Sequence, residues 1–477
     1  TDRNGRYISK SVLTTNVGVD PKMVRDKKKL LIKLQYTFPE KDMSEIREKL
    51  SEENFFYIKK KVPPERFQKI KLLGEKSIRL EPRITRIYPD KNLFSHILGQ
   101  IDDNNNGISG IEKSFDKKLK DGRKKLILTL DKDLQFIIRN ELINAQNIFK
   151  SIGGTGILMD INNGEILSLV SIPDFNLNLR ENLDDKKYIN RATKGVYELG
   201  SVFKTFTIAA GLNYNLITPT DMFTNLEKKM KCGGRTISEY DEDLPKDLSV
   251  EDILIFSSNI GSVKVGQIIG KEKMKEFLSL IGVLHKMEFD IEEIGRPLPF
   301  KWRNCKLKTI SYGHGITTTP IQLARGYAIL SNGGYQVNPT LIKKKSNNSK
   351  RKKILNDDVS PKINSILRKV VTDGTASLSD VEGYEIGGKT GTALIVENGI
   401  YTSKKINTFA SVFPISNPKY VLVVLLEDTK LSKDYMYKYR NKPGSFKGTP
   451  FNTAGWTSVE IAGKIIDKIG PILATKY

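Results

Sequence analysis

The sequence is poor in histidine, the side chain that most often serves as a general base. It contains only His96, His285 and His314 among 477 residues. None of them lies in a Gly-x-Ser-x-Gly elbow or beside a convincing Ser/Asp partnership, which argues against a Ser-His-Asp triad. A nucleophilic serine in this chain would therefore have to transfer its proton to another kind of side chain.

Cysteine is equally scarce, and Cys232 and Cys305 are the only two in the sequence. They show neither a Cys-x-x-Cys pair nor the spacing of metal ligands. The two residues either form a disulfide outside the cytoplasm or remain free thiols, and the sequence does not decide between these states.

Long hydrophobic runs are also missing. The densest apolar segment, Tyr420 to Leu426, has the length of a strand. A membrane span needs roughly 18 apolar residues, and no segment approaches that length. The sequence shows no signal peptide either.

Acidic residues are too few to balance the basic ones. There are 78 Lys and Arg residues against 55 Asp and Glu residues, which leaves a net charge of +23. Nucleic acid is not expected as a partner, because zinc spacing, an aromatic RNA-binding signature and a basic zipper region are all missing. We interpret the lysines first as solvated surface in a compositionally biased chain, and second as an attraction to membranes or anionic cell-wall polymers.

What the sequence does contain is a serine followed three residues later by a lysine, at Ser201 and Lys204. Residues i and i+3 share one face of a helix, so the Lys204 amine can reach the Ser201 hydroxyl. Lys204 must be neutral to act as the base, and burial or the positive charge of Lys389 would lower its pKa. The apolar residues between Phe203 and Leu212 have helical spacing and place Ser201 near the N-terminus of a buried helix.

A second short pattern, Ser257-Ser258-Asn259, carries little weight by itself, because Ser346-Asn347-Asn348 matches it too. Ser-x-x-Lys likewise recurs at Ser114 to Lys117 and at Ser349 to Lys352. Taken singly, such matches are explained by solvated surface, a loop or a helix cap. As part of an active site, Ser257 would pass a proton between Lys204 and the leaving group, while Asn259 would hold the substrate amide and steady Lys204.

The string Lys389-Thr390-Gly391 is rarer, and it opens a segment to Val396 that predicts a strand. Glycine weakens a strand interior, and the usual compensation is close approach by another backbone or a ligand. An extended peptide could then dock along this strand as an added strand. The backbone amides of Thr392 and Ser201 would form an oxyanion hole.

Four further segments predict strands, and together with the Lys389 strand they predict a mostly antiparallel sheet of five. These segments are Gly156 to Asp160, Glu165 to Ser171, Phe409 to Phe413 and Tyr420 to Leu426. The first two flank the turn-forming cluster Asn162-Asn163-Gly164. The last helix presents Trp456, Val459, Ala462, Ile466 and Ile469 on one face, which should pack on the sheet.

Other stretches give coarser expectations. Asp42 to Asn54 has a charged helical pattern, and Ile208 to Leu330 is expected to be largely helical. Leu126 to Phe149 predicts a strand followed by a helix, and we place a domain boundary near it. Lys343 to Lys353 is rich in Lys, Ser and Asn and predicts a surface loop.

The three motifs together resemble those of class B penicillin-binding proteins, the monofunctional peptidoglycan D,D-transpeptidases, and most of all their division-specific, FtsI-type branch. The resemblance extends over nearly the whole chain. It is carried by Asp2-Arg3-Asn4-Gly5, Arg86-Ile87-Tyr88-Pro89, Gly110-Ile111-Glu112, Asn190-Arg191-Ala192, Tyr197-Glu198-Leu199-Gly200-Ser201, Ser311-Tyr312-Gly313-His314-Gly315-Ile316, Thr319-Pro320-Ile321-Gln322-Leu323 and Ser331-Asn332-Gly333-Gly334. One departure is Leu199, where relatives usually have proline.

The resemblance implies an α+β multidomain fold. Residues 1–145 would form a non-catalytic, elongated pedestal of the dimerisation type. Residues 146–477 would form the penicillin-binding transpeptidase domain, with a five-stranded antiparallel sheet flanked by helices. Because family members carry a membrane anchor just ahead of the Asp2-Arg3-Asn4-Gly5 string, we expect a single-pass protein of the bacterial inner membrane, with this region on the periplasmic side.

The resemblance also implies roles for individual residues. Ser201 would be acylated, Lys204 would be the general base, and Ser257 and Asn259 would line the cleft. Lys389, Thr390 and Thr392, with Gly391 between the threonines, would recognise the terminal carboxylate of the substrate. His314 would lie near the cleft, where we interpret it as a structural loop residue rather than a catalytic one.

The implied substrate is the D-Ala-D-Ala end of a peptidoglycan stem peptide, which β-lactams imitate. The implied partners are a SEDS-family glycan polymerase and other division proteins. No cofactor or metal is called for, because nucleophile, base and anion clamp are all side chains.

Two other functions use the same motifs. A serine β-lactamase or D,D-carboxypeptidase must activate water, commonly with a placed glutamate, and we identify none in the sequence. A non-catalytic β-lactam sensor or scaffold can keep all the motif residues, although the pedestal and the division-type strings count against it.

Overall fold

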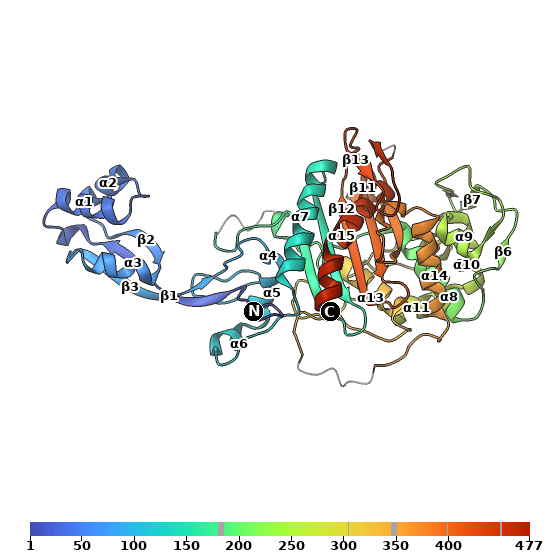
Figure 1. Ribbon diagram of the computed structural model, residues 1–477, viewed down its shortest axis with the longest axis horizontal. Helices are drawn as coiled ribbons and strands as arrows, with labels where there is room; N and C mark the ends of the chain where they lie inside the picture. The colour runs from blue at the N-terminus through green and yellow to red at the C-terminus, as the bar shows by residue number, and fades with distance from the viewer. Residues whose placement is uncertain (180–185, 304, 345–350, 398, 449–450) are drawn as a thin grey trace. The chain divides into compact units, whose positions relative to one another are not determined.

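The computed structural model describes residues 1–179, 186–303, 305–344, 351–397, 399–448 and 451–477 (Figure 1). The chain forms two compact units. The larger comprises Thr1–Arg6, Asp90–Asp102 and Asn106–Tyr477, and the smaller comprises Tyr7–Pro89 and Asp103–Asn105. The functional division near residue 145 stays a prediction.

The smaller unit is a three-stranded antiparallel sheet with helices, in the strand order β2-β1-β3. Its elements are β1 (Lys10–Val19), a 3-10 turn (Pro21–Met23), α1 (Lys27–Thr37), α2 (Met43–Ser51), β2 (Phe56–Val62), α3 (Pro64–Lys71) and β3 (Ile78–Ile87). Asp26 and Asp42 cap α1 and α2 by accepting backbone N–H bonds, so the helix expected after Asp42 is confirmed. Val17, Leu34 and Phe38 lie in the apolar core between the sheet and the helices.

The larger unit is built on a five-stranded sheet in the order β10-β11-β12-β4-β5, and every neighbouring pair is antiparallel. The strands are β4 (Gly153–Asp160), β5 (Ile166–Ile172), β10 (Gly387–Glu397), β11 (Ile400–Phe413) and β12 (Tyr420–Glu427). All five predicted strands are therefore confirmed. The β4–β5 turn depends on Gly164, whose φ is +78° and whose Cβ, if it had one, would lie 2.2 Å from the Asn338 carbonyl oxygen.

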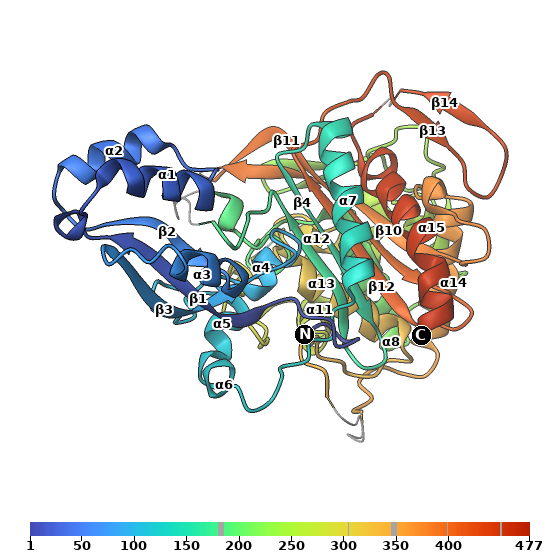
Figure 2. The same ribbon diagram turned by 60° about the vertical axis from the view of Figure 1, so that its left-hand side comes forward.

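Helices cover both faces of this sheet, which gives the predicted α+β layers (Figures 1 and 2). α7 (Lys132–Phe149) and α15 (Ser458–Lys476) lie side by side on one face, and α13 (Pro320–Ser331) packs on the other. The predicted apolar stripe of α15 is confirmed, because Val459, Ala462 and Ile466 are fully buried against the sheet. Trp456 lies just before this helix, in a 3-10 turn (Ala454–Trp456).

The remaining described elements surround this core and include the helical half of the larger unit. The helices are α4 (Ser95–Leu98), α5 (Gly110–Ser114), α6 (Asp116–Asp121), α8 (Lys204–Asn213), α9 (Val250–Ile255), α10 (Asn259–Ile269), α11 (Lys271–Leu280), α12 (Lys306–Ser311) and α14 (Val359–Thr372). The short strands are β6 (Met222–Phe223), β7 (Lys229–Cys232), β8 (Arg235–Ser238), β9 (Leu248–Ser249), β13 (Met436–Lys438) and β14 (Ser445–Lys447). The 3-10 turns lie at Lys186–Tyr188, Gly200–Phe203 and Ser377–Ser379. The largely helical character expected for residues 208–330 is confirmed, with the short strands β6 to β9 as an unpredicted addition.

One prediction was wrong in part. The helix expected within Leu126 to Phe149 is α7, but the residues from Leu126 to the start of α7 do not form the expected strand. Leu128 forms only an isolated bridge with Ile342, and its N–H donates to the Thr1 carbonyl, while the Thr129 N–H donates to Leu341. Because these backbone partners come from separate segments, no ladder can propagate along residues 126–130.

Some expectations fall on residues outside the described ranges. They are the surface loop across residues 345–350 and the stray motif matches at Ser346-Asn347-Asn348 and Ser349 to Lys352. Of the helices in the described part of the chain, none is both long and apolar enough to cross a membrane.

Candidate active site

The first and third motifs meet backbone to backbone. Ser201 lies in the 3-10 turn that leads directly into α8, close to the predicted helix N-terminus. A Cβ on Gly391 would lie 2.2 Å from the Leu199 carbonyl oxygen, and one on Gly200 would lie 2.7 Å from that of Thr392. Strand β10 and the serine turn therefore lie so close together that only glycine fits at these two positions. This is the close approach that was predicted from the glycines of the strand.

Ser257 is the point where the three motifs converge. The Lys204 ammonium donates to the Ser257 carbonyl and, over 3.1 Å, to the Ser257 Oγ. Lys389 Nζ donates to the same Oγ over 3.0 Å, and also to the carbonyl and the hydroxyl of Thr390. Ser257 holds this position with a backbone φ of +62°, a left-handed conformation that costs energy for any residue other than glycine.

The expected direct contact between Lys204 and Ser201 is not made. Within the described part of the chain, no hydrogen bond joins the Lys204 amine to the Ser201 hydroxyl. The amine donates instead to the carbonyl and the Oγ of Ser257. Nor does Asn259 hold Lys204, because its side-chain amide donates to the Ser238 carbonyl over 2.8 Å. Catalytic hydrogen bonds often tighten only when substrate is bound, so the roles expected for Ser201, Lys204 and Asn259 stay predictions.

Both lysines are completely buried, and their charge states follow from that burial. Removal from water lowers the pKa of Lys204 to about 7, and the nearby Glu239 carboxylate opposes this effect. Burial also lowers the pKa of Lys389 far below its ordinary value, and the charge of Lys204 lowers it further. Burial, rather than the charge of Lys389, is therefore the main reason why the Lys204 amine can lose its charge near pH 7.

Glu239 is a residue that sequence reasoning missed. Its carboxylate accepts hydrogen bonds from Ser258 Oγ at 2.6 Å, from the Asn259 N–H at 2.7 Å and from the Ile260 N–H at 3.0 Å. It thus caps the N-terminus of α10, where a negative charge is favoured. Ser258 is the N-cap of the same helix, so the helix-cap interpretation of this motif is correct for its middle serine.

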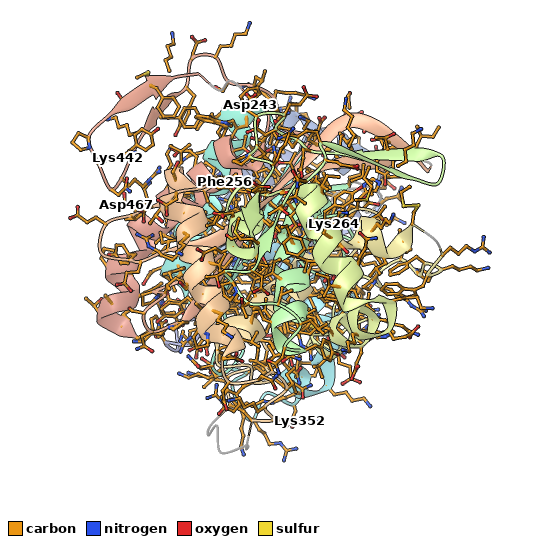
Figure 3. The ribbon with its side chains drawn as sticks, turned by 90° about the vertical axis from the view of Figure 1, so that its right-hand side faces the viewer. Asp243, Phe256, Lys264, Lys352, Lys442 and Asp467 are labelled. Carbon is orange, nitrogen blue, oxygen red and sulfur yellow. A yellow bond between two sulfur atoms is a disulfide. The ribbon has the colours of Figure 1, made fainter. Side chains whose placement is uncertain are left out.

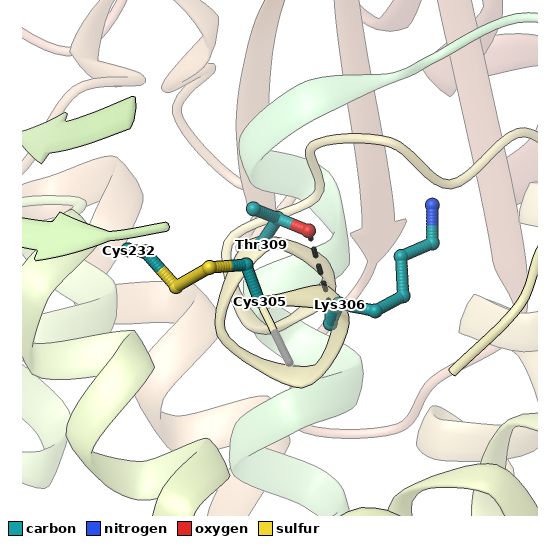
Figure 4. The surroundings of a disulfide bond; sticks show 4 residues. All are labelled: Cys232, Cys305, Lys306 and Thr309. Carbon is teal, nitrogen blue, oxygen red and sulfur yellow. Dashed lines mark hydrogen bonds between the residues drawn. A yellow bond between two sulfur atoms is a disulfide. The ribbon is translucent and has the colours of Figure 1, made fainter. Parts of the chain in front are cut away.

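A disulfide joins Cys232, at the end of β7, to Cys305, the residue before α12 (Figure 4). The Cα atoms are 5.6 Å apart, and the alternative that the sequence left open is decided in favour of the bonded state. Strands β7 and β8 pair as a hairpin that ends in Ser238, and Glu239 follows it. The disulfide therefore tethers the hairpin whose end holds the second motif in place.

The threonines of the third motif are held by the surrounding structure. The Thr390 hydroxyl lies 2.8 Å from that of Thr375. Thr392 Oγ1 donates to Asn407 Oδ1 over 3.0 Å and accepts from the Ala454 N–H over 3.0 Å. Among the described strands, β10 pairs only with β11 and is therefore an edge strand. That an extended peptide adds along it stays a prediction.

These groups border a cavity of about 860 Å³. Among its lining residues are Ser201, Ser257, Asn259, Thr390 and Thr392, whereas the buried Lys204 and Lys389 are not. Phe256, which is 40% exposed, also lines the cavity and is visible on the side of the unit that carries α9 and α10 (Figure 3). In the described part of the chain, no cluster of three or more His, Cys, Asp or Glu side chains could hold a metal ion.

Comparison with known proteins gives this arrangement a family. The family model for the penicillin-binding protein transpeptidase domain matches residues 154–445, and the model for the penicillin-binding protein dimerisation domain matches residues 1–146. The chain belongs to the penicillin-binding protein transpeptidase family, and the class B resemblance read from its motifs is confirmed.

Individual relatives point to the FtsI-type branch. The chain is 27% identical to the probable peptidoglycan D,D-transpeptidase FtsI of Caulobacter vibrioides, over 100% of this chain and 81% of that protein. It is also 27% identical to peptidoglycan D,D-transpeptidase FtsI of Escherichia coli K12, over 91% of this chain and 79% of that protein.

Solved structures share the fold. A peptidoglycan synthetase from Bifidobacterium adolescentis superposes with a TM-score of 0.73 at 20% identity, covering 99% of this chain and 94% of that one. Penicillin-binding protein 3 from Mycobacterium tuberculosis, complexed with aztreonam, gives 0.72 at 22% identity, covering 83% and 92%.

Proposed function

We propose that this protein is a serine-type peptidoglycan D,D-transpeptidase that cross-links stem peptides. The observation that carries the proposal is the position of Ser257 Oγ, within 3.1 Å of the buried Lys204 amine and 3.0 Å of the buried Lys389 amine, at the wall of the cavity that Ser201 also lines. Such a group can move a proton between a neutral amine and a reacting bond without histidine.

The reaction has two halves. In the first, Ser201 Oγ attacks the carbonyl carbon between the two terminal D-alanines, and neutral Lys204 takes the hydroxyl proton. Ser257 passes that proton to the departing nitrogen as the C–N bond breaks, so D-alanine leaves and an ester remains on Ser201. In the second half, an amine from a neighbouring stem peptide displaces Ser201 and forms the cross-link.

The other motif residues bind the substrate in this scheme. The Thr390 and Thr392 side chains line the cavity and are candidates to bind the terminal carboxylate, while Gly391 between them lets β10 lie close to the serine turn. Lys389 acts from behind Thr390, to which it donates. Asn259 also lines the cavity and holds the substrate amide in this scheme, and the amides of Ser201 and Thr392 stabilise the oxyanion.

A covalent inhibitor tests the proposal directly. After treatment with benzylpenicillin, the peptide that contains Ser201 should carry the mass of the opened β-lactam, and the Ser201→Ala variant should carry none. A folded protein without added mass on this peptide would refute the proposal. Nitrocefin distinguishes the hydrolase alternative, because rapid turnover rather than a long-lived adduct would indicate a β-lactamase.

The cellular setting belongs to the same proposal. The Cys232–Cys305 disulfide fits an oxidising compartment, so we place this region on the periplasmic side of the inner membrane. The similarity to FtsI proteins favours septal wall synthesis with a SEDS-family glycan polymerase and other division proteins as partners. Depletion of the protein should then produce filaments, whereas rounded cells would indicate a role in elongation.

A further inference from the structure

A cluster of polar side chains at the cavity takes no part in the acylation scheme above. Glu198, three residues before Ser201, accepts hydrogen bonds from the Tyr401 hydroxyl at 3.1 and 3.3 Å. His314 Nδ1 lies 3.5 Å from the same carboxylate, and its Nε2 lies 3.2 Å from the Tyr401 hydroxyl. All three residues line the same cavity as Ser201.

The cluster is held by stacked rings. The His314 imidazole stacks on Tyr401 with ring centroids 5.1 Å apart, and on Tyr312 with centroids 5.9 Å apart. Tyr401 belongs to β11, next to the edge strand β10, and His314 belongs to the loop after α12. Two elements of the fold therefore converge on one carboxylate beside the nucleophile.

The charge of Glu198 is not balanced by a permanent cation. Its side chain is only 12% exposed, yet in the described part of the chain no lysine or arginine lies within ion-pair distance of it. The nearby Lys306 ammonium donates to the Gly315 carbonyl and lies over the Phe300 ring. Burial lowers the pKa of Lys306, and the Glu198 charge only partly opposes that effect. A mostly buried carboxylate that faces a cavity without a paired cation is a favourable place for a ligand cation.

We propose that Glu198, with Tyr401 and His314, binds the ammonium group of the acceptor stem peptide beside acylated Ser201. This inference rests on the transpeptidase function proposed above and assigns its second substrate to a wall of the cavity. A primary side-chain amine is protonated near neutral pH, so a carboxylate and a hydroxyl can bind it until it reacts. The bound ion supplies the cation that neither a lysine nor an arginine of the described residues supplies to Glu198.

The chemical step then balances. The ammonium gives one proton to the His314 imidazole, and from there the proton goes to solvent. The amine nitrogen attacks the ester carbonyl carbon, the new C–N bond forms, and the bond between that carbon and Ser201 Oγ breaks. A second amine proton passes through neutral Lys204 to Ser201 Oγ, which restores the serine hydroxyl.

The test measures how the acyl-enzyme divides its product between an amine and water. A thioester analogue of the donor peptide acylates Ser201 and releases a thiol, and the acyl group then passes to water, to D-alanine or to methanol. The ratio of aminolysis to hydrolysis is independent of the rate of acylation. For Glu198→Gln this ratio should fall about tenfold or more at subsaturating D-alanine, because a charge-assisted contact is lost.

Methanol and a second glutamate provide the controls. The ratio of methanolysis to hydrolysis should stay the same in Glu198→Gln, because methanol carries no charge. Glu397→Gln, at an exposed glutamate of β10 that pairs with Lys404, should change neither ratio. If Glu198→Gln does not fold, Tyr401→Phe keeps the ring and should lower the aminolysis ratio alone, by a smaller factor.

The possible outcomes distinguish a failure of this inference from a failure of the proposed transpeptidase function. If the wild-type protein transfers to D-alanine and the folded Glu198→Gln and Tyr401→Phe variants do so equally well, Glu198 does not bind the acceptor, but the transpeptidase proposal stands. A parallel fall of both ratios would show a structural role for Glu198 and would also overturn the inference. If the wild-type protein is not acylated on Ser201 at all, both proposals fail together.

Discussion

The two compact units treat charge in opposite ways. Between Tyr7 and Pro89, a stretch that the structure describes throughout, no Asp, Glu, Lys or Arg is buried. Ion pairs there lie at the surface, as in Glu40 with Lys59 and Arg66, while the core is apolar. The larger unit buries Lys204 and Lys389 completely, and also the carboxylate of Glu460.

Within the larger unit, buried ionisable groups are of two kinds: those with a partner of opposite charge and those without one. A buried ion loses its hydration and must be compensated, so it persists only where the surrounding structure or the chemistry requires it. Glu460 has a compensating partner in Arg440. The two lysines have only neutral hydrogen-bond partners in the described part of the chain, and their lowered pKa values are the consequence. The following substitutions test this comparison, from the largest expected effect to the smallest.

The buried lysine of the first motif should give the largest effect. We expect Lys204→Met to lower the rate of acylation by a fluorescent penicillin by about a thousandfold or more, since the proposed general base is removed. Methionine has a similar length and needs no hydration, so the melting temperature should fall little or not at all. Lys264→Met, at an exposed lysine of α10, is the matched control and should change neither quantity (Figure 3). Acylation at more than a tenth of the wild-type rate would exclude Lys204 as the base.

A buried ion pair of the same unit should show the opposite behaviour, with a loss of stability. Arg440 makes two bonds to Glu460, of 2.9 and 3.0 Å, and Glu460 is 1% exposed. Arg440→Met removes both of these bonds and leaves the Glu460 carboxylate with only the more distant Lys464 ammonium, at 3.8 Å, as a cation partner, which should lower the free energy of unfolding by about 3 kcal/mol.

Urea denaturation followed by tryptophan fluorescence measures this loss. The only two tryptophans, Trp302 and Trp456, both belong to the larger unit, so the signal reports on that unit alone. The double variant Arg440→Met/Glu460→Met removes both charges and should recover part of the stability. A loss below about 1 kcal/mol in the single variant would show that the burial of charge is not what distinguishes this unit.

The third effect concerns the pH dependence of acylation. The pKa of Lys204 is about 7, so the rate should rise as pH increases through about 7 and the neutral amine becomes the main form. The negative charge of Glu239 raises the Lys204 pKa, so Glu239→Gln should move this midpoint to lower pH, by roughly 0.5 to 1 unit. Glu242→Gln, on the exposed segment after the hairpin, is the control. A midpoint that stays in place would show that Glu239 only caps α10.

The comparison also explains what could be predicted from the sequence. The five strands were recognisable because alternating or continuous apolar runs are bounded by turn residues, as at Asn162-Asn163-Gly164. The residues of the three motifs were recognisable because the three strings together, and the segments around them, resemble those of a known family. The smaller unit carries no such constellation, in agreement with its apolar core and its paired surface charges.

What could not be predicted depends on contacts between distant segments. Glu239 has no motif of its own, and its role arises only when the β7–β8 hairpin meets the N-terminus of α10. The partner of Lys204 was expected three residues away at Ser201 and lies instead at Ser257. The pairing of Cys232 with Cys305 spans 73 residues, and neither spacing nor composition indicates such a pair. Leu126 to Leu130 has the pattern of a strand, but its backbone partners come from separate segments.

The smallest effect should come from a surface ion pair of the smaller unit. Hydrogen bonds from Lys59 and Arg66 lower the pKa of Glu40 to about 2, so this pair favours the folded state near neutral pH and loses that contribution as pH falls from about 4.5 toward 2. The Glu40 side chain is 38% exposed, however, so water and salt screen the interaction. We expect Glu40→Gln to change the stability of the smaller unit by less than about 1 kcal/mol, measured by scanning calorimetry at pH 7, and the change should shrink further in 1 M salt. A loss as large as that of Arg440→Met would mean that exposure does not govern the contribution of these charges, and the contrast between the two units would then need another cause.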